Sequence, residues 1–419
     1  MEMNYKSTDI GMIPLDWQIK TIEQLFDKGF QNGVFLEVDR KGKGVPIVNV
    51  SNLYGNLPIN TAALERFDAR SEEIDRFRVH KGDLFFTRSS IVPEGIAMCN
   101  VYDGKDEDNA VFDSHVIKLS VKQSEVNALF LGLQCRMPYS RNFFIANSKT
   151  AIMTTIDQKS MAKCPIPMPK LSEQDDIVDV LKRFDTYIDD LAELIEKKKG
   201  IRDGALEDLV SGNTRITGFS SEREEYSIND ITHAVITGGT PSTAHEEYYG
   251  GDIPWLASTE IHQKRITKPT TYITELGLNN SSAKIAPENS VLIALAGQGK
   301  TRGTAAYLTK PMALNQSLAA LVTNEKCNSE FLYYLIESMY LPLRELSSGD
   351  GGRGGLNKKL IKGFLVTIPI DVNEQTAIAN TLLAMDKEIT DLEREREKII
   401  QIREGAMDDL LTGRVRLTT

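Results

Sequence analysis

Residues 171–216 read LSEQDDIVDVLKRFDTYIDDLAELIEKKKGIRDGALEDLVSGNTRI, and the chain repeats this stretch 201 positions later. The second copy, residues 372–417, reads VNEQTAIANTLLAMDKEITDLEREREKIIQIREGAMDDLLTGRVRL. The two copies align without a gap, since Glu173-Gln174 returns as Glu374-Gln375. A repeat with so long a period indicates that the chain consists of two related halves.

Each copy has the pattern of a coiled-coil helix. Apolar residues recur at alternating spacings of four and three, which is the a/d seam of a heptad repeat, and charged residues flank that seam. The seam residues are Ile177, Leu181, Phe184, Ile188, Leu191 and Ile195 in the first copy, and Ile378, Leu382, Met385, Ile389 and Leu392 in the second. A helix continuous to Val210 would be a rod of roughly 57 Å at ~1.5 Å per residue. Two such helices bury their seams most simply against each other, so we expect an antiparallel pair.

A globular segment precedes each helix. Short apolar runs alternate with Gly, Pro, Asn and Asp turns before each repeat, as strands of a mixed sheet do. Pro165, Pro167 and Pro169 then require an extended entry to the first helix. We expect an α+β fold with a pseudo-two-fold internal repeat. Its parts would be a first globular domain (1–170), a first spacer helix (171–216), a second globular domain (217–371) and a second spacer helix (372–419).

Several local patterns of the first domain return in the second. A helical stretch near Asn127–Gln134 has apolar residues that could share one face, and Phe331, Leu332 and Leu335 stand roughly at the same place in the second half. Leu356-Asn357-Lys358-Lys359 echoes Ile156-Asp157-Gln158-Lys159. The helices match well and the globular segments match poorly, which indicates similar domains with different surfaces.

The composition is that of a globular protein with more than one domain. The chain has 419 residues, of which 41% are hydrophobic and 26% charged. The N-terminus lacks the pattern of a signal peptide, and no apolar run is long enough to span a bilayer. Four scattered cysteines show no paired spacing, so we expect reduced core residues in a cytoplasmic protein.

The net charge of −10 argues at first against a nucleic-acid partner, but the acidity is concentrated in the repeated helices. Residues 171–210 contain 12 acidic and 6 basic residues, and residues 372–411 contain 10 acidic and 5 basic residues. The remainder has 38 basic and 37 acidic residues. The globular domains can therefore present basic loops to an anionic partner.

Catalytic motifs are scarce. The run from Ala294 to Thr301, with Gly299 and Lys300, resembles a relaxed phosphate-binding loop after an apolar strand. Such a loop needs a helix after the lysine, whereas the sequence from Arg302 onward predicts a hairpin into another strand. A nucleotide-dependent enzyme that uses Lys300 remains an alternative at this point. The five histidines lack metal-ligand spacing, and we expect neither a metal site nor a catalytic residue in this chain.

The remaining candidates are loops that combine glycine, a cation and a polar side chain. Each could be a solvated turn, but several of them on both halves favour a DNA surface, because Lys and Arg neutralise phosphates and amides read base edges. The candidate DNA-binding residues are Lys41, Lys43, Arg88, Ser89 and Ser90 in the first half, and Gly239, Thr240, Ser242, Gln298, Lys300, Thr301, Arg302, Gln316, Arg353, Asn357 and Lys358 in the second.

These pieces resemble the specificity subunits of type I restriction–modification enzymes. The resemblance rests on the two Glu-Gln-led helices, on their endings GALEDLVSGNTRI and GAMDDLLTGRVRL, and on three stretches of the second domain. Those stretches are Gly238-Gly239-Thr240-Pro241-Ser242, Tyr249-Gly250-Gly251-Asp252-Ile253-Pro254-Trp255 and Leu314-Asn315-Gln316. It covers nearly the whole chain. The first domain departs from the pattern: it lacks a Gly-Gly-Thr-Pro stretch, and His115 stands near the place of Gln316.

The resemblance implies two target recognition domains, each of which reads one half of a bipartite double-stranded DNA site. It also implies that the spacer helices carry two methyltransferase subunits and that restriction/motor subunits join them. S-adenosylmethionine, ATP and Mg would be bound by those partners, not by this chain. A coiled-coil scaffold whose globular ends bind protein instead of DNA is the rival interpretation.

Overall fold

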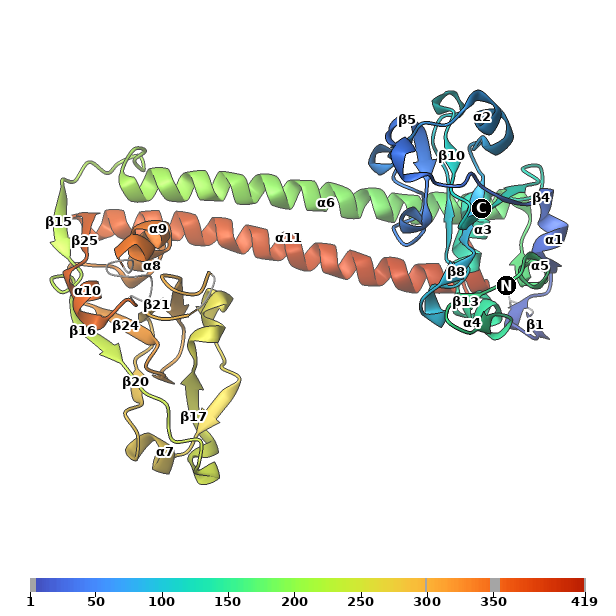
Figure 1. Ribbon diagram of the computed structural model, residues 1–419. Coiled ribbons are helices and arrows are strands. Elements are labelled where there is room, and N and C mark those ends of the chain that lie inside the picture. The colour runs from blue at the N-terminus through green and yellow to red at the C-terminus, as the bar shows by residue number, and fades with distance from the viewer. Residues whose placement is uncertain (1–4, 298–299, 347–354, 418–419) are drawn as a thin grey trace. The chain divides into compact units, whose positions relative to one another are not determined.

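The structure, a computed structural model, describes residues 5–297, 300–346 and 355–417, and it divides into two compact units (Figure 1). The first unit comprises residues 1–190 and 395–419, and the second comprises residues 191–394. Each unit therefore contains one globular domain together with one end of each long helix.

The repeated stretches form two helices of 41 residues, α6 (Leu171–Ser211) and α11 (Val372–Thr412). Every expected seam residue is buried or half-buried. Each helix ends before a glycine in the left-handed region, Gly212 (φ 85°) and Gly413 (φ 71°). The Gly212 N–H donates to the Asp208 carbonyl at 3.1 Å, which satisfies one of the last free carbonyls of α6. The repeated glycine is therefore a helix stop.

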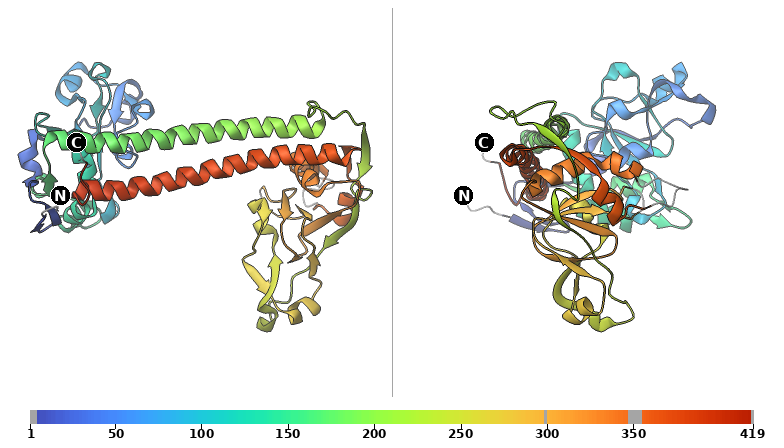
Figure 2. Two further views of the ribbon diagram at one scale, coloured as in Figure 1. Left: turned by 180° about the vertical axis from the view of Figure 1, so that it is seen from behind. Right: turned by 90° about the vertical axis from the view of Figure 1, so that its left-hand side faces the viewer.

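The two helices run antiparallel within each unit. In the first unit the beginning of α6 lies beside the end of α11, and Arg403 Nε contacts Asp185 Oδ1 at 2.8 Å. In the second unit the order is reversed, and Arg202 Nε contacts Asp386 Oδ1 at 2.8 Å. The helix segments lie side by side in both views of Figure 2. The expected antiparallel coiled coil is confirmed.

The first domain is built on a four-stranded antiparallel sheet of order β4-β11-β7-β9, next to a three-stranded sheet of order β10-β5-β6 in which β10 and β5 are parallel. Smaller sheets are β1-β2, β14-β3 and β12-β13-β8. The strands are β1 (Tyr5–Thr8), β2 (Gly11–Pro14), β3 (Gln18–Thr21), β4 (Phe26–Asn32), β5 (Lys41–Val48), β6 (Glu65–Phe67), β7 (Leu84–Thr87), β8 (Ser89–Ser90), β9 (Cys99–Val101), β10 (Val111–Phe112), β11 (Val116–Val121), β12 (Lys149–Thr150), β13 (Thr154–Thr155) and β14 (Pro165–Met168). The helices are α1 (Ile22–Leu25), α2 (Ser71–Phe77), α3 (Ala128–Arg136), α4 (Pro138–Ala146) and α5 (Gln158–Ala162), with 3₁₀ turns η1 (Val38–Arg40), η2 (Val50–Leu53), η3 (Thr61–Ala63), η4 (Pro93–Gly95) and η5 (Asp106–Asp108).

The second domain has the same strand order with small additions. Its main sheet is β16-β24-β21-β22-β18, its second sheet is β19-β17-β23-β20 with β17 and β23 parallel, and β15 pairs with β25. The strands are β15 (Arg223–Ser227), β16 (Thr232–Thr237), β17 (Tyr249–Leu256), β18 (Arg265–Ile266), β19 (Thr271–Ile273), β20 (Lys284–Ala286), β21 (Val291–Ala294), β22 (Ala305–Leu308), β23 (Met312–Leu314), β24 (Leu318–Thr323) and β25 (Leu365–Pro369). The helices are α7 (Glu275–Asn279), α8 (Ser329–Ser338), α9 (Tyr340–Leu346) and α10 (Lys358–Gly363), with 3₁₀ turns η6 (Glu246–Tyr248) and η7 (Ser258–Gln263).

The internal repeat therefore extends to the globular domains, where the sequence alone shows it poorly. The order β4-β11-β7-β9 corresponds to β16-β24-β21-β22, and the parallel pair β5–β10 corresponds to β17–β23. Helices α3 and α8 also correspond, because Asn127 and Asn328 cap their N-termini in the same way. This match places Phe331 opposite Phe130, within the helical stretch near Asn127–Gln134 where the apolar pattern roughly placed it.

Each domain shares its hydrophobic core with the helix ends. In the first unit Ile177, Leu181 and Leu411 belong to the same buried cluster as Trp17 and Phe130. In the second unit Val210, Ile378 and Leu382 belong to the cluster that contains Phe331. All four cysteines are buried and unpaired. Among the described residues, no helix combines the length and apolarity that a membrane crossing requires.

Candidate nucleic-acid interface

The repeated glutamines fix each globular domain to the start of a long helix. Gln174 is fully buried, and its side-chain oxygen accepts from the Asn127 N–H at 2.9 Å. Its amide group donates to the carbonyls of Glu125 and Pro169, both at 3.0 Å. Because Asn127 caps α3, this side chain connects α6 directly to a helix of the domain.

Gln375 makes the matching contacts in the second unit. It accepts from the Asn328 N–H at 2.8 Å and donates to the carbonyls of Lys326 (3.0 Å) and Pro369 (2.8 Å). The repeated glutamine is thus an anchor for the domain, a role that the sequence motif did not reveal.

The neighbouring glutamates bind the tail that follows the other long helix. Glu374, fully buried at the start of α11, accepts from Arg215 at 2.8 Å, just after the end of α6. Glu173, at the start of α6, accepts from Arg416 at 2.8 Å, just after the end of α11. Each arginine lies three residues beyond its helix-stop glycine. Because it pairs with the glutamate at the start of the other helix, we call each of these pairs, Arg215–Glu374 and Arg416–Glu173, a clamp.

Each domain contains the same kind of turn, and in each domain this turn lies where its two sheets meet. A Cβ on Gly33 would lie 1.9 Å from the Phe112 carbonyl oxygen, and a Cβ on Gly238 would lie 1.8 Å from the Leu314 carbonyl oxygen. Glycine is therefore required at both positions by an approach within the domain. Gly239 is likewise enclosed, since a Cβ there would lie 1.9 Å from the Ser282 hydroxyl oxygen. The Gly-Gly pair thus serves internal packing, whereas the sequence interpretation assigned it to approach by a partner.

A buried polar side chain follows the strand that this turn approaches: Asp113 after β10 in the first domain, and Asn315 after β23 in the second. Asp113 Oδ1 accepts from the His115 N–H at 3.1 Å, and Asn315 Oδ1 accepts from the Ser317 N–H at 3.0 Å. The Asp113 and Asn315 N–H groups both donate to the strand beside them. Asp113 therefore matches Asn315, so Ser114, rather than His115, occupies the place of Gln316. His115 therefore lies beside the place of Gln316, as expected, and matches Ser317.

Polar side chains surround this turn in the second domain. Thr240 is exposed and its hydroxyl donates to Gln316 Oε1 at 2.7 Å, which brings together two of the expected DNA-binding residues. Ser242 is also exposed, two residues further along the chain. The backbone of Leu295 donates to the Ser317 carbonyl at 2.8 Å, and Leu356 donates to the Leu295 carbonyl at 3.1 Å.

In the first domain the corresponding surface carries cations and hydroxyls. The Arg88 N–H donates to the His115 carbonyl at 3.1 Å, as Leu295 does to Ser317, so Arg88 matches Leu295. Ser89 lies in β8 opposite Thr155 of β13, which in turn lies opposite Lys149 of β12. Arg88, Thr155 and Lys149 are exposed. Ser90 is different, because it is buried and its hydroxyl accepts from the Val92 N–H at 3.3 Å.

Lys41 and Lys43 lie elsewhere in the first domain. They occupy the beginning of β5, whereas Val48 at its end accepts from the Asp113 N–H at 2.9 Å. Lys43 contacts Asp68 at 3.1 Å. The structure therefore does not bring these two lysines together with Arg88.

The segment around Lys300 is part of a hairpin. The described residues after Lys300 form a turn that leads into β22, which pairs antiparallel with β21. The Thr301 hydroxyl contacts His262 Nε2 at 3.1 Å, and the Tyr340 hydroxyl donates to the Lys300 carbonyl at 3.1 Å. The absence of a helix between Lys300 and β22 rules out the phosphate-binding loop and confirms the expected hairpin.

The other candidates of the second domain have mixed settings. Asn357 caps α10, because its Oδ1 accepts from the Lys359 and Leu360 N–H groups, and Lys358 is exposed on the first turn of that helix. Gln298 and Arg353 lie outside the described residues.

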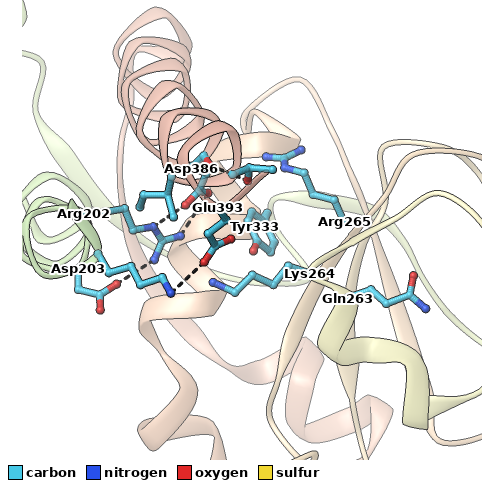
Figure 3. Close-up of a pocket in the computed structure, with 11 residues that line it drawn as sticks. Arg202, Asp203, Gln263, Lys264, Arg265, Tyr333, Asp386 and Glu393 are labelled. Carbon is cyan, nitrogen blue, oxygen red and sulfur yellow. Dashed lines mark hydrogen bonds and ion pairs between the residues drawn. The ribbon is translucent and has the colours of Figure 1, made fainter. Parts of the chain in front are cut away.

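A charged cavity of about 480 Å³ lies between the second domain and its helix ends (Figure 3). Arg202 enters it from α6 and pairs with three carboxylates, those of Asp203, Glu337 and Asp386. Burial opposes the charge, yet Glu337 and Asp386 raise the pKa of the Arg202 guanidinium above its ordinary value. Lys264 contacts Glu337 at 3.3 Å, and Lys199 contacts Glu393 at 2.9 Å. Because these cations are already paired, the cavity is a joint between domain and helices rather than a site for an anion.

Among the described residues, no cluster of His, Cys, Asp or Glu is placed to hold a metal ion.

Comparisons with known proteins agree on one family. Residues 14–199 and 220–402 each match the family described as the type I restriction modification DNA specificity domain. The MjaVIII type I restriction enzyme specificity subunit of Methanocaldococcus jannaschii is 22% identical over 432 residues, covering 99% of this chain and 97% of that protein. The EcoR124I/EcoR124II specificity subunit of Escherichia coli is 26% identical over 239 residues, covering 55% of this chain and 57% of that protein.

Two solved structures have the same fold. The S subunit of a type I restriction–modification system from M. genitalium matches 98% of this chain and 99% of its own with a TM-score of 0.56 at 17% identity. The HsdS subunit from Thermoanaerobacter tengcongensis matches 96% of this chain and 98% of its own with a TM-score of 0.55 at 16% identity.

Proposed function

The chain belongs to the family of type I restriction–modification DNA specificity proteins, and from this premise we propose that each of its globular domains reads one half of a bipartite double-stranded DNA site. The chain is the specificity subunit, and the chemistry belongs to its partners. We call each globular domain a target recognition domain, and we call the DNA that it reads a half-site.

One observation carries the proposal: the two domains share a strand order while the exposed side chains at the matching turn differ. Ser114 and His115 stand in the first domain where Gln316 and Ser317 stand in the second. Arg88 is exposed in the first domain, whereas Leu295 at the matching position of the second is buried. Ser, His, Gln and Arg side chains hydrogen-bond base edges or phosphates. One scaffold with two different reading surfaces suits the recognition of two different sequences.

The helices suit protein partners. Their net charges of −6 and −5 disfavour contact with DNA, and we propose that they carry two methyltransferase subunits, which in turn bring restriction/motor subunits. S-adenosylmethionine, ATP and Mg would be bound by these partners. The rival function is a coiled-coil scaffold whose domains bind only protein.

Mapping of methylated adenines in DNA from cells that express the chain with its methyltransferase tests the proposal. We expect modification at one bipartite sequence, lost when the chain is deleted. Replacement of Gln316 with Ala should change the preferred bases in one half-site only and leave the other half unchanged. A uniform loss of methylation at both halves would contradict reading by Gln316, and methylation independent of the chain would favour the scaffold.

A further inference from the structure

Two neighbouring loops of the first target recognition domain expose apolar side chains. Ile91 and Val92 follow β8 and are 84% and 52% exposed, and Ile152 and Met153 precede β13 and are 97% and 43% exposed. We call these four residues the apolar tip. Isolated exposed apolar residues are ordinary, but four at one place indicate a contact surface.

The strand register brings the two loops together. Ser90 of β8 lies opposite Thr154 of β13, and Ser89 lies opposite Thr155. Continuing this antiparallel register by one residue places Ile91 opposite Met153. The Ala151 N–H donates to the Met153 carbonyl at 3.2 Å and closes the second loop around Ile152.

Buried groups hold the first loop in place from below. The Arg141 guanidinium donates to the carbonyls of Ala97 and Glu94, both at 2.8 Å, and to that of Ile96. Burial lowers the pKa of Arg141, because desolvation disfavours the charged form of its guanidinium. The Gly95 carbonyl also accepts from the Thr87 hydroxyl at 2.7 Å. A loop fixed in this way presents Ile91 and Val92 outward without an ordering cost on binding.

The surroundings of the apolar tip favour DNA as its partner. Arg88 and Lys149 are exposed beside it. The nearby carboxylate of Asp157 is engaged by the N-terminus of α5, where it accepts from the Ser160 N–H at 2.8 Å. The Arg88 N–H joins this surface to the reading turn at His115.

The shape and size of the apolar tip point the same way. A stable protein interface needs about 800 Å² on each partner, whereas two narrow loops that project beside cations suit a groove. Proteins insert Ile, Met or Leu between base steps from the minor groove, and they contact thymine methyl groups in the major groove.

We propose that Ile91, Val92, Ile152 and Met153 contact bases of the half-site that the first domain reads. This proposal rests on the proposed function. Arg88 and Lys149 hold the flanking phosphates, and the apolar side chains exclude water from the bases between them. In the second domain the matching sequence before Leu356 is Gly349–Gly355, which contains Arg353 and no apolar side chain.

The test compares full-length chains assembled with the methyltransferase on a double-stranded oligonucleotide library with randomised positions. The variant Ile91→Ser/Ile152→Ser should bind the DNA selected by the wild type about tenfold more weakly, equivalent to about 1.4 kcal/mol. Its preference should relax in one half-site and persist in the other. Met12→Ser, which changes a 55% exposed residue of β2 in the same unit, should bind as the wild type does.

Substitution of uracil for thymine in the selected DNA separates the two kinds of base contact. A loss of affinity that the double variant no longer shows assigns the tip to thymine methyl groups. An unchanged affinity, with DNA bending that the wild type induces and the variant does not, assigns it to a base step.

Unchanged affinity and preference in the double variant would overturn the proposal. Loss of methyltransferase assembly with the DNA preference intact would overturn it as well, because the tip would then be a protein contact. If the wild-type assembly selects no DNA sequence, the proposed function itself fails, which is a different result from either of these. Since all four side chains are exposed, the thermal unfolding of the variant should match that of the wild type.

Discussion

The anchoring of the target recognition domains depends on single buried side chains. Gln174 and Gln375 each satisfy one N–H and two carbonyls, and in each case the hydrogen bond to a proline carbonyl, Pro169 or Pro369, is fully buried. A buried polar group that loses its partner costs roughly 1–3 kcal/mol. These glutamines are therefore expected to matter more for stability than any exposed ion pair along the helices.

Replacement of Gln375 with Leu should lower the free energy of unfolding by roughly 1–3 kcal/mol, because the Asn328 N–H and the carbonyls of Lys326 and Pro369 lose their hydrogen bonds, and the contact to Pro369 is fully buried. The chain offers a convenient probe: Trp17 lies in the first unit and Trp255 in the second, and these are its two tryptophans. Urea unfolding in a Trp17→Phe background reports the second unit. Asn380→Leu is the control, since Asn380 is exposed on the same helix within the second unit and should change stability little. Equal effects of both changes would contradict the anchor.

The two symmetry-related arginines should differ in their contribution. The Arg202 side chain is 5% exposed and pairs with Asp203, Glu337 and Asp386, so Arg202→Met removes three ion pairs from a largely enclosed site and should cost about 3 kcal/mol. Arg403 is 21% exposed and pairs with a partner that is 42% exposed, so Arg403→Met should cost less than about 1 kcal/mol. Urea unfolding of each unit, followed by its own tryptophan, measures both. A larger loss for Arg403→Met would show that burial does not decide the difference.

Residue roles were the part that the sequence predicted least. The repeated Glu-Gln and the repeated arginine were visible as a pattern, but Glu173 meets Arg416 across 243 positions and Gln174 meets Asn127 across 47. Local periodicity contains no information about such pairs. The candidates Lys43 and Arg88 were equally plausible in sequence, and only the folded strands separate them.

At the scale of elements, the helices and their ends follow from local chemistry. The heptad seams, the extended proline entry and the caps at Asp157 and Asn357 were all predictable, because each depends on residues within one turn or strand. The shared strand order of the two domains was not, since different side chains fill the same positions.

The long helices also carry a glycine that their own packing does not explain. Gly204 and Gly405 occupy matching positions inside α6 and α11, and a Cβ at either would meet open space within the described residues. Glycine in a helix interior costs about 1 kcal/mol relative to alanine. Gly204→Ala and Gly405→Ala should therefore each raise the free energy of unfolding by about that amount, measured by urea unfolding of the isolated chain. A lower stability in either variant would contradict the open space beside the glycine.

At the scale of the whole molecule, the chain carries two similar domains on one repeated framework. Each target recognition domain presents an asparagine-capped helix to a glutamine at a helix start, and each helix start holds the tail of the other helix. The anchoring contacts are the same for both domains, and the reading surfaces are not.

A chain in which residues 217–371 also replace residues 1–170 should therefore fold, because Asn328 would meet Gln174 as Asn127 does. Given the proposed function, its methylation site should contain the second half-site twice and the first not at all. Adenine methylation mapping in cells that also express the methyltransferase measures this. An assembled but inactive hybrid would show that the first domain contributes more than its own half-site.

The clamps and anchors have a consequence for inheritance. The gene segments that encode residues 171–216 and 372–417 specify the same framework residues, so a crossover within them would attach a foreign reader at a register that already fits. Glutamine, glutamate and arginine would all find their partners in the recombinant. New combinations of half-sites could then arise in a single genetic event, without any intermediate that has to repair its fold.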